Sequence, residues 1–487
     1  MVPIVGCGNF AAHGGLRRGL RVIGAAVLLG GAAAVAAGAE NRPGVRATWT
    51  EVNSLEELRR HASEPGARIR LRPGEYRVES APTRHFFALT GRGSKWDLTG
   101  VRLIVDTKLF RQFGPAKGPE PYYCVFLLAG DDIEFFGARI ETAGDLPGLQ
   151  SKNKIFSVTG SRVVLRDVEL ITAGSSPWGY GSLYGISGGD VRKMNGIRVG
   201  WPARDVQVLR CRVQMRAMGH GIFVQGASGT VIRDCVVEGL LRPTEDILAE
   251  CAGYAFERSF LAKGRNYSEG VRLGPKGEIL PGEMVALSED GIRMYADGGS
   301  GRPTGPTVIE HCRVTRMRRG ICTALGPAAD RIVDCEVREC VTAGFTVGSG
   351  DVVEQGRADA KYGEALCVPG GGARGAVAEV TLLDSRQGRA NDLVAVINGR
   401  DHRIRLRAES DDFIPPGWRI EMASRSGYAF YQRRTPGAER IELRNETTAA
   451  VVLGDDAVSN GVRSRGAVTG REEVRSRNRI AVAPGNP

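Results

Sequence analysis

Five short segments of this 487-residue chain share one pattern, in which a glycine is followed by alternating apolar residues. Aligned on that glycine, they place five residues at one position: Tyr184, His220, Asp290, Arg319 and Ala343. If the segments are neighbouring strands of a sheet, these side chains form a column with a spacing of about 4.8 Å. Histidine, carboxylate and guanidinium groups can transfer protons and neutralise negative charge. We expect a catalytic site here, and the structural alternative is a ladder of ion pairs.

Glycoside hydrolysis is one reaction that suits this column. It needs two carboxyl groups, about 5–5.5 Å apart when configuration is retained and about 6.5–9.5 Å apart when it is inverted. Glu289 and Asp290 supply such a pair, and Glu250 and Glu269 are further candidate partners.

β-Elimination of an acidic polysaccharide is the other reaction. It needs a base that takes the proton next to a uronate carboxylate, and a cation that neutralises that carboxylate. His220, Tyr295 or Lys263 can serve as the base, and Arg293 or Arg319 as the cation. The sequence leaves hydrolysis and elimination open.

The glycine segments alternate with a second strand of constant pattern, as in TVIRDCVV (Thr230–Val237) and TVIEHCRV (Thr307–Val314). The resulting two-strand unit repeats every 23–24 residues, a period typical of a solenoid. Glycine supplies 67 residues and no helical periodicity is sustained after the N-terminal region. We predict an all-β chain in which residues 45–455 form one parallel β-helix.

Ten cysteines in an exported protein would usually indicate disulfides. Four of them instead occupy one position of the repeat, where Val168 stands in an earlier copy: Cys211, Cys235, Cys312 and Cys335. Exchange with valine favours a buried column of free thiols. No cysteine or histidine spacing indicates a zinc site.

One long insertion interrupts the repeat. Between the second strand and the next glycine there are 8 to 10 residues in three copies, but 56 before the Asp290 segment. Residues 242–287 therefore leave the stack and return directly into that segment, which favours a site there because loops carry function in such folds. Aromatic and basic side chains near this corner suit a sugar-binding groove. The expected substrate-binding residues are Trp178, Tyr180, Tyr184, Lys263 and Tyr295.

The two ends of the chain differ from the repeats. Residues 1–39 have the pattern of an export signal, with three arginines, an apolar run and Ala-Gly-Ala at 37–39. The apolar run is too short and too rich in glycine and alanine to favour a permanent span. We expect a secreted or periplasmic protein without an integral membrane span, and a polar tail at residues 456–487.

The segment Thr48–Val78 predicts a helix, a turn and a strand. Ser54 and Glu57 have the spacing of a capping box at the helix start. The following P-G-x-x-I-x-L-x-P-G-x-Y pattern resembles the N-terminal cap and first coil of pectin-lyase-like right-handed parallel β-helix proteins, and the resemblance continues to about residue 385. It implies a right-handed parallel β-helix with a short N-terminal capping helix. That fold carries lyases, hydrolases, epimerases and non-catalytic binding proteins, so it implies no single reaction.

Two glycine segments also resemble motifs of polygalacturonase-type glycoside hydrolases. Glu289-Asp290-Gly291-Ile292 is similar to N-T-D-G-I, and Gly219-His220-Gly221-Ile222 is similar to G-H-G-I. Their order along the chain is reversed, and the family's paired-aspartate and R-I-K motifs are not found. The resemblance therefore carries over only Asp290, as an acid/base carboxylate, and His220, as its support.

Net charge bears on the partner. The formal charge is +11, or +8 after loss of the three arginines of the signal (11 − 3), which favours an acidic substrate. No basic run with interleaved aromatics indicates nucleic acid. No cofactor is expected, and calcium has no supporting motif because paired aspartates occur only in isolation. We predict a monomeric, exported carbohydrate-active enzyme that cleaves a polysaccharide, acidic by this charge argument; the alternative is a non-catalytic β-helix that binds glycan or joins an envelope assembly.

Overall fold

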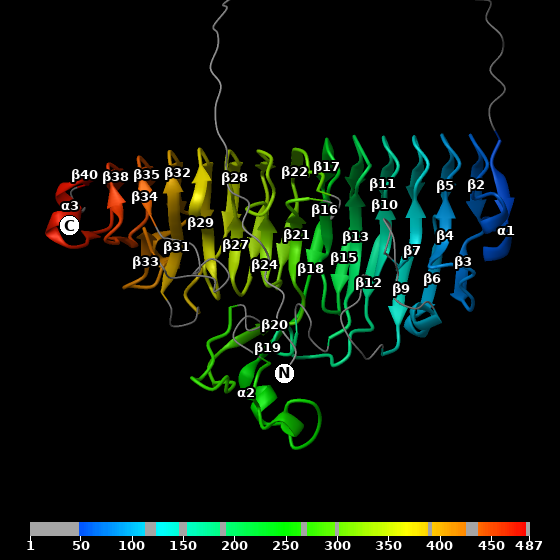
Figure 1. Ribbon diagram of the computed structural model, residues 1–487, viewed down its shortest axis with the longest axis horizontal. Helices are drawn as coiled ribbons and strands as arrows, with labels where there is room; N and C mark the ends of the chain where they lie inside the picture. The colour runs from blue at the N-terminus through cyan, green and yellow to red at the C-terminus, as the bar shows by residue number, and fades with distance from the viewer. Residues whose placement is uncertain are drawn as a thin grey trace, which may run out of the picture. The chain divides into compact units, whose positions relative to one another are not determined.

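In the computed structural model, each strand is hydrogen-bonded in parallel to the equivalent strand one repeat later (Figure 1). The structure describes residues 48–112, 123–145, 153–185, 191–263, 270–297, 301–387, 392–424 and 437–483. Within them, β17 (Thr230–Arg233) pairs with β22 (Thr307–Glu310), and β18 (Val236–Glu238) pairs with β23 (Arg313–Thr315), both in parallel. The strands stack along the long axis as a parallel β-helix, which confirms the predicted fold class.

Each coil contains three strands rather than the two that the sequence pattern suggested. The segment TVIRDCVV breaks at Asp234, which has a left-handed φ of 56° and separates β17 from β18. The same break recurs at one position of successive coils, at Asp167, Arg210, His311 and Asp334. The third strand of the coil carries the glycine segments, as in β16 (Ile222–Gln225) and β21 (Asp290–Met294).

The glycines of these segments form a ladder inside the coil. A Cβ on Gly291 would overlap the Cγ1 atom of Val314 and lie 2.9 Å from the carbonyl oxygen of Gly320. Equivalent valines, Val237 and Val337, and the carbonyl oxygen of the next glycine crowd Gly221 and Gly320 in the same way. Glycine is therefore needed because the valines of the neighbouring strand row pack directly against this backbone.

The cysteine column is buried, as the sequence indicated. Cys211, Cys235, Cys312 and Cys335 are at most 2% exposed and all are free thiols. The backbone N–H of Cys312 donates to Cys335 Sγ at 3.4 Å, so successive cysteines of the column contact one another along the stack. Among the nine described cysteines, Cys251 is exposed.

The two ends of the stack carry different structures. Ser54 caps α1 (Leu55–Arg60) by accepting the N–H of Glu57 at 3.1 Å, as predicted, but Glu57 accepts the N–H of Asn53 at 2.7 Å, so the return bond reaches the residue before the cap. The prediction of a polar tail from residue 456 was wrong for residues 457–483. They continue the coils, because β38 (Gly461–Ser464) pairs with β40 (Arg479–Val482) and alternating apolar residues such as Val462 reach the core.

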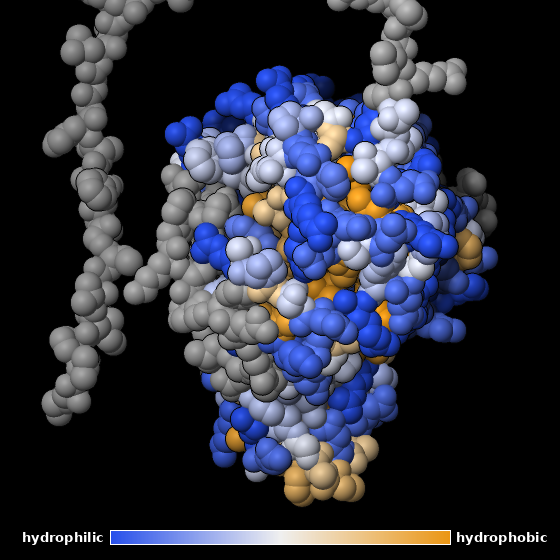
Figure 2. Space-filling model, turned by 90° about the vertical axis from the view of Figure 1, so that its right-hand side faces the viewer, coloured by the Kyte–Doolittle hydropathy of each residue, from blue (hydrophilic) through white to orange (hydrophobic). Residues whose placement is uncertain are grey.

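The insertion projects from one side of the stack (Figure 1). It begins and ends as an antiparallel pair, β19 (Leu241–Pro243) with β20 (Met284–Ala286), and contains α2 (Thr244–Leu248). Figure 2 shows a mostly hydrophilic surface on the face drawn, with apolar residues at the lower tip. Large apolar side chains exposed on the insertion include Phe256, Leu261 and Leu280.

None of the described helices is long and apolar enough to cross a membrane. The export signal predicted at residues 1–39 lies outside the described residues.

Replacement of Gly291 by alanine should destabilise the fold by about 1–3 kcal/mol, because the added methyl group overpacks the ladder. The thermal midpoint of unfolding measures this. Gly372→Ala is the control, since no atom lies within 4 Å of its added Cβ. Equal midpoints for the two variants would contradict the packing role of the ladder.

Thiol labelling tests the cysteine column. In the native protein Cys251 should react rapidly, while the eight buried cysteines of the described chain react only after unfolding. Ellman's reagent with and without denaturant gives both counts, and Cys251→Ser should abolish the rapid phase. Rapid reaction of several thiols in that variant would show that the column is accessible.

Candidate functional site

Three of the predicted site residues come together at the start of neighbouring strands. Asp290 in β21 is paired in register with Arg319 in β24 (Arg319–Cys322). His220 lies beside Asp290, because its Nδ1 accepts the backbone N–H of Asp290 at 3.2 Å. The sequence alignment on the glycine therefore identified this part of the column.

Tyr184 does not belong to the column, contrary to expectation. The strand before His220 is β13 (Met194–Gly200), and Asn195 precedes its glycine. Asn195 Oδ1 accepts the backbone N–H of His220 at 2.9 Å. Tyr184-Gly185-Ile and Asn195-Gly196-Ile have the same local pattern, so the sequence did not distinguish the loop from the strand.

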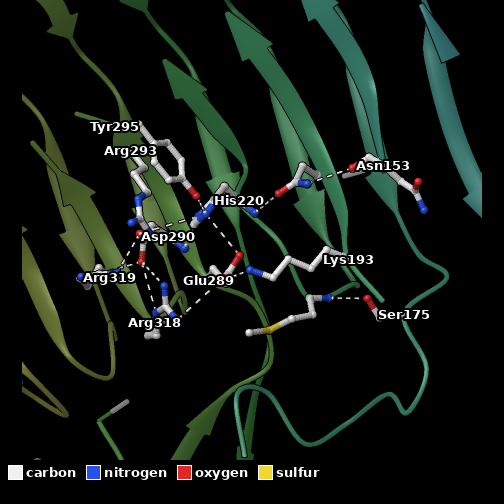
Figure 3. Close-up of polar contacts among 12 residues, drawn as sticks. Asn153, Ser175, Lys193, His220, Glu289, Asp290, Arg293, Tyr295, Arg318 and Arg319 are labelled. Atoms are coloured by element: carbon white, nitrogen blue, oxygen red, sulfur yellow. Dashed lines mark hydrogen bonds and ion pairs between the residues drawn. The ribbon is translucent and has the colours of Figure 1, made fainter. Parts of the chain in front are cut away.

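Asp290 lies fully buried among three guanidinium groups (Figure 3). Its carboxylate accepts hydrogen bonds from Arg319 at 2.8 and 3.1 Å, from Arg318 at 3.1 Å and from Arg293 at 2.9 Å. Burial alone would raise the pKa of Asp290, but Arg319, Arg318 and Arg293 outweigh it and hold the pKa well below its usual range. Asp290 is therefore a permanent anion.

Glu289 has a similar environment on the other side of the cluster. Its Oε1 accepts from Lys193 Nζ at 2.7 Å and lies 3.7 Å from Arg318 Nη1. Burial opposes ionisation, but the charges of Lys193 and Arg318 and the hydrogen bond from Lys193 lower the pKa of Glu289 below its usual value. With both Glu289 and Asp290 ionised and removed from solvent, neither can supply the protonated acid that glycoside hydrolysis requires.

His220 connects the carboxylates to a tyrosine. Burial lowers the pKa of His220 to about 3, so its ring is neutral near pH 7. Because Nδ1 accepts a backbone N–H, the ring proton is assigned to Nε2. Nε2 lies 2.8 Å from the hydroxyl oxygen of Tyr295 and donates to it. This hydrogen bond fixes the position of the Tyr295 oxygen. The hydroxyl proton of Tyr295 can then be donated to another group.

Arg293 and Tyr295 form the outer edge of the cluster. The Arg293 side chain is 13% exposed and Tyr295 is partly exposed, whereas the other charged side chains and His220 are fully or almost fully buried. The Arg293 guanidinium lies 4.2 Å from the centre of the Tyr295 ring. Arg293 Nε has no hydrogen-bond partner within the described residues, and burial raises the pKa of Tyr295 to about 12.

The cluster holds more positive than negative charge. With His220 neutral, four cations face two carboxylates, a formal surplus of two (4 − 2), the members being Lys193, Arg293, Arg318, Arg319, Glu289 and Asp290. Glu364, buried two strands beyond Arg319 at the same register, reduces the surplus to one (2 − 1). An excess of buried positive charge beside a phenol can bind an anion and handle a proton.

The other predicted residues belong to the insertion and its packing. Trp178, Tyr180 and Tyr184 join a separate apolar cluster with the insertion. The Tyr180 hydroxyl donates to Glu250 at 2.7 Å, so the Glu250 carboxylate is hydrogen-bonded outside the Asp290 cluster. Lys263 is exposed on the insertion, and Glu269 lies outside the described residues.

Lys193 and Arg318 complete the cluster. Lys193 stands in a loop whose path the sequence did not reveal. Arg318 directly precedes Arg319, and consecutive residues of a strand point to opposite faces, so the sequence did not indicate that both arginines bind Asp290.

No group of three or more histidine, cysteine or acidic side chains suited to a metal ion occurs among the described residues. The paired aspartates of the sequence include Asp131 and Asp132, which instead contact Arg162 at 3.6 and 2.6 Å.

Comparison with known proteins gives matches at the level of structure. No protein-family model and no curated protein matches the chain. The chain is similar to a pectate lyase (12% identity, 86% of this chain and 72% of that chain, TM-score 0.37) and to the catalytic domain of a GH87 α-1,3-glucanase (11%, 92% and 70%, TM-score 0.47). It is also similar to the Dettilon tailspike protein (11%, 88% and 64%, TM-score 0.47). These structural neighbours therefore include a polysaccharide lyase and a glycoside hydrolase.

Asp290→Asn should destabilise the protein by about 3–5 kcal/mol, because it leaves buried guanidinium groups without their counter-charge. Chemical denaturation measures the change. Asp401→Asn removes an exposed partner of Arg440 and should cost no more than about 1 kcal/mol. An unchanged stability of Asp290→Asn would show that the cluster does not depend on this carboxylate.

Proposed function

We propose that the protein cleaves an acidic, uronate-containing polysaccharide by β-elimination at the Arg293–Tyr295 edge of the charge cluster. The observation that carries this proposal is the pairing of a fixed, histidine-bound phenol with the partly exposed Arg293, whose guanidinium lies 4.2 Å from the centre of the phenol ring. The basic net charge of the chain supports an acidic substrate.

Arg293 binds the uronate carboxylate in this mechanism. Its Nη1 is held by Asp290 at 2.9 Å, so the guanidinium plane is fixed before substrate arrives. The exposed part of the Arg293 side chain presents its positive charge to the substrate carboxylate. Neutralising the carboxylate makes the neighbouring C–H bond more acidic, because the carbanion that forms there delocalises into that group.

Tyr295 transfers the proton. As tyrosinate it takes the proton from the carbon next to the carboxylate, a carbon–carbon double bond forms, and the bond to the leaving glycosidic oxygen breaks. Tyr295 then returns the proton to that oxygen and is regenerated. The Nε2–H of His220 and the Arg293 guanidinium both stabilise the tyrosinate.

Elimination is preferred to hydrolysis because of the state of the carboxylates. Glu289 and Asp290 are buried and ion-paired, and their pKa values lie below the usual range. Neither can protonate a leaving group. Their function in this proposal is to hold His220 and the arginines in place.

A non-catalytic glycan-binding protein is the second candidate. The same partly exposed Arg293 and the surplus positive charge would bind an acidic glycan without any chemical step. Binding without turnover, insensitive to loss of the Tyr295 hydroxyl, would identify it.

Tyr295→Phe should lower the turnover of a uronate polysaccharide by at least about 10²-fold, because it removes the proton-transferring hydroxyl. Polygalacturonate and alginate are suitable probes, and the ultraviolet absorbance of the unsaturated uronate measures the product. Turnover by the native protein should rise about tenfold per pH unit between about pH 7 and 9, because more Tyr295 ionises as pH approaches its pKa of about 12.

Tyr76→Phe is the matched control. The Tyr76 hydroxyl donates to the carbonyl oxygen of Arg72, in a part of the chain remote in sequence from the Asp290 cluster. Both tyrosine variants should keep the native thermal midpoint within a few degrees. New reducing ends without an unsaturated product would contradict elimination and point to hydrolysis.

A further inference from the structure

One corner of the coil carries a tryptophan where the coils on both sides have glycine. Continuing the register of β10 (Asn153–Val158), β13 and β16 beyond their last residues aligns Trp201 with Gly160 and Gly226. A Cβ on Gly160 would overlap the carbonyl oxygen of Gly130 at the preceding corner, so packing requires glycine there. The same packing gives no reason for a large aromatic side chain at position 201.

Trp201 is partly exposed, and an arginine lies over its ring. The guanidinium carbon of Arg302 is 5.3 Å from the ring centroid, and Arg302 is exposed. The Arg302 side chain forms no ion pair or hydrogen bond with the described residues, and these include Asp297, which lies opposite Pro303. Because the contact with the indole leaves the guanidinium N–H groups unused, they can bind a carboxylate.

Trp201 lies on the same row of strand ends as Tyr295. The backbone N–H of Trp201 donates to the carbonyl oxygen of Gln225 at 3.0 Å, and that of Tyr295 donates to the carbonyl oxygen of Val224 at 2.9 Å. Since β13, β16 and β21 belong to successive coils, Trp201 stands two coils, or about 10 Å along the stack, from Tyr295. Gln225 lies between them and is also partly exposed. A single sugar at Tyr295 does not span this distance, but an oligosaccharide does.

The segment that follows β21 brings Arg302 to this row. The backbone N–H of Thr304 donates to the carbonyl oxygen of Ala296 at 3.1 Å, and Thr304 Oγ1 accepts the backbone N–H of Gly226 at 2.8 Å. Residues 301–305 are therefore held against the corner of β16, where Gly226 has no side chain to block their path toward Trp201. The strand that carries Tyr295 and Arg293 is thus followed directly by the residues that place a cation beside the indole.

We propose that Trp201 and Arg302 form a subsite for a second uronate unit of the same polysaccharide, two coils away from the bond that is cleaved. The apolar face of this sugar ring stacks on the indole, and its carboxylate pairs with Arg302. A polyuronate repeats its carboxylate along the chain, so cations at Arg293 and at Arg302 suit two units of one molecule. The inference rests on the proposed function for its substrate, but it concerns binding and not the elimination step.

Tryptophan fluorescence measures this binding without turnover in the Tyr295→Phe variant, with galacturonate and alginate tetramers as probes. At least one tetramer should change the emission, and adding Trp201→Phe should abolish the change because the stacked indole is its source. Trp49→Phe is the matched control and should keep the change. Trp49 is also partly exposed, and the guanidinium carbon of Arg70 lies 5.1 Å from its ring centroid, in the first coil.

Affinity gives a second readout, by calorimetry in the same background. Trp201→Ala should weaken binding of the tetramer at least about tenfold, as loss of an aromatic anchor does. Arg302→Gln should weaken it about two- to fivefold, and should have no effect on the methyl-esterified tetramer, which lacks the carboxylates. Arg302 is exposed, so this variant serves if Trp201→Ala does not fold.

The outcomes separate the subsite from the elimination. No binding of either tetramer, an emission change that persists without Trp201, or an equal effect of Arg302→Gln on the charged and esterified tetramers would overturn the subsite. Binding that depends on Trp201 and Arg302, in a protein whose native form yields no unsaturated uronate, would keep the subsite and reject the elimination.

Discussion

The close approach of the valine row to the glycine ladder is the constraint on which the site depends. Because Gly291 and Gly320 have no Cβ, Val314 and its counterparts pack against the backbone of the strand that carries them. That packing fixes the start of each glycine strand at the same height on successive coils. The residue before each glycine then lies beside the residue before the glycine of the next coil. Asp290 and Arg319 come into register in this way. The local conformation of one residue type thus sets a long-range contact.

The cluster that results is stable only as a set. Removing a carboxylate and a guanidinium from water costs several kcal/mol per ion, and the attraction between them offsets this only when the hydrogen bonds are well formed. Asp290 meets that condition through Arg318, Arg319 and Arg293, and Glu289 meets it through Lys193. The same ion pairs that stabilise the carboxylates prevent them from exchanging protons. Chemistry is therefore left to the groups at the edge of the cluster.

The fold was predictable because it rests on short-range, repeated signals. Glycine spacing, the exchange of Val168 with cysteine and the helix cap at Ser54 each depend on residues of one coil, and the coils repeat. The break at Asp234 was missed, because a left-handed aspartate leaves no interruption in the apolar pattern. The coils after residue 456 were missed because exposed arginines alternate there with small apolar residues, which resembles a polar tail.

The site was only partly predictable for a different reason. Alignment on glycine gave His220, Asp290 and Arg319, but the roles of these residues depend on which charges surround them. Lys193 reaches Glu289 from a loop 96 residues away in sequence, and no spacing rule encodes that contact. Tyr184 fitted the pattern as well as Asn195 did, since three residues are too few to separate a strand from a loop. The residue types therefore indicated where the site lies, and the burial of the side chains determined which of them can transfer protons.

Two of the buried aspartates in the described chain show how one scaffold can give the same group opposite properties. Asp290 and Asp359 are both almost inaccessible to water. Three arginines depress the pKa of Asp290, whereas Asp359 has only backbone N–H donors and its pKa is raised to about 6. The difference comes from the neighbouring coil, which offers arginines beside Asp290 and backbone amides beside Asp359. Since a coil exposes each position to the coil before and after it, the residues of the adjacent coils help to decide whether a buried aspartate is a fixed anion or a group that responds to a ligand or to pH.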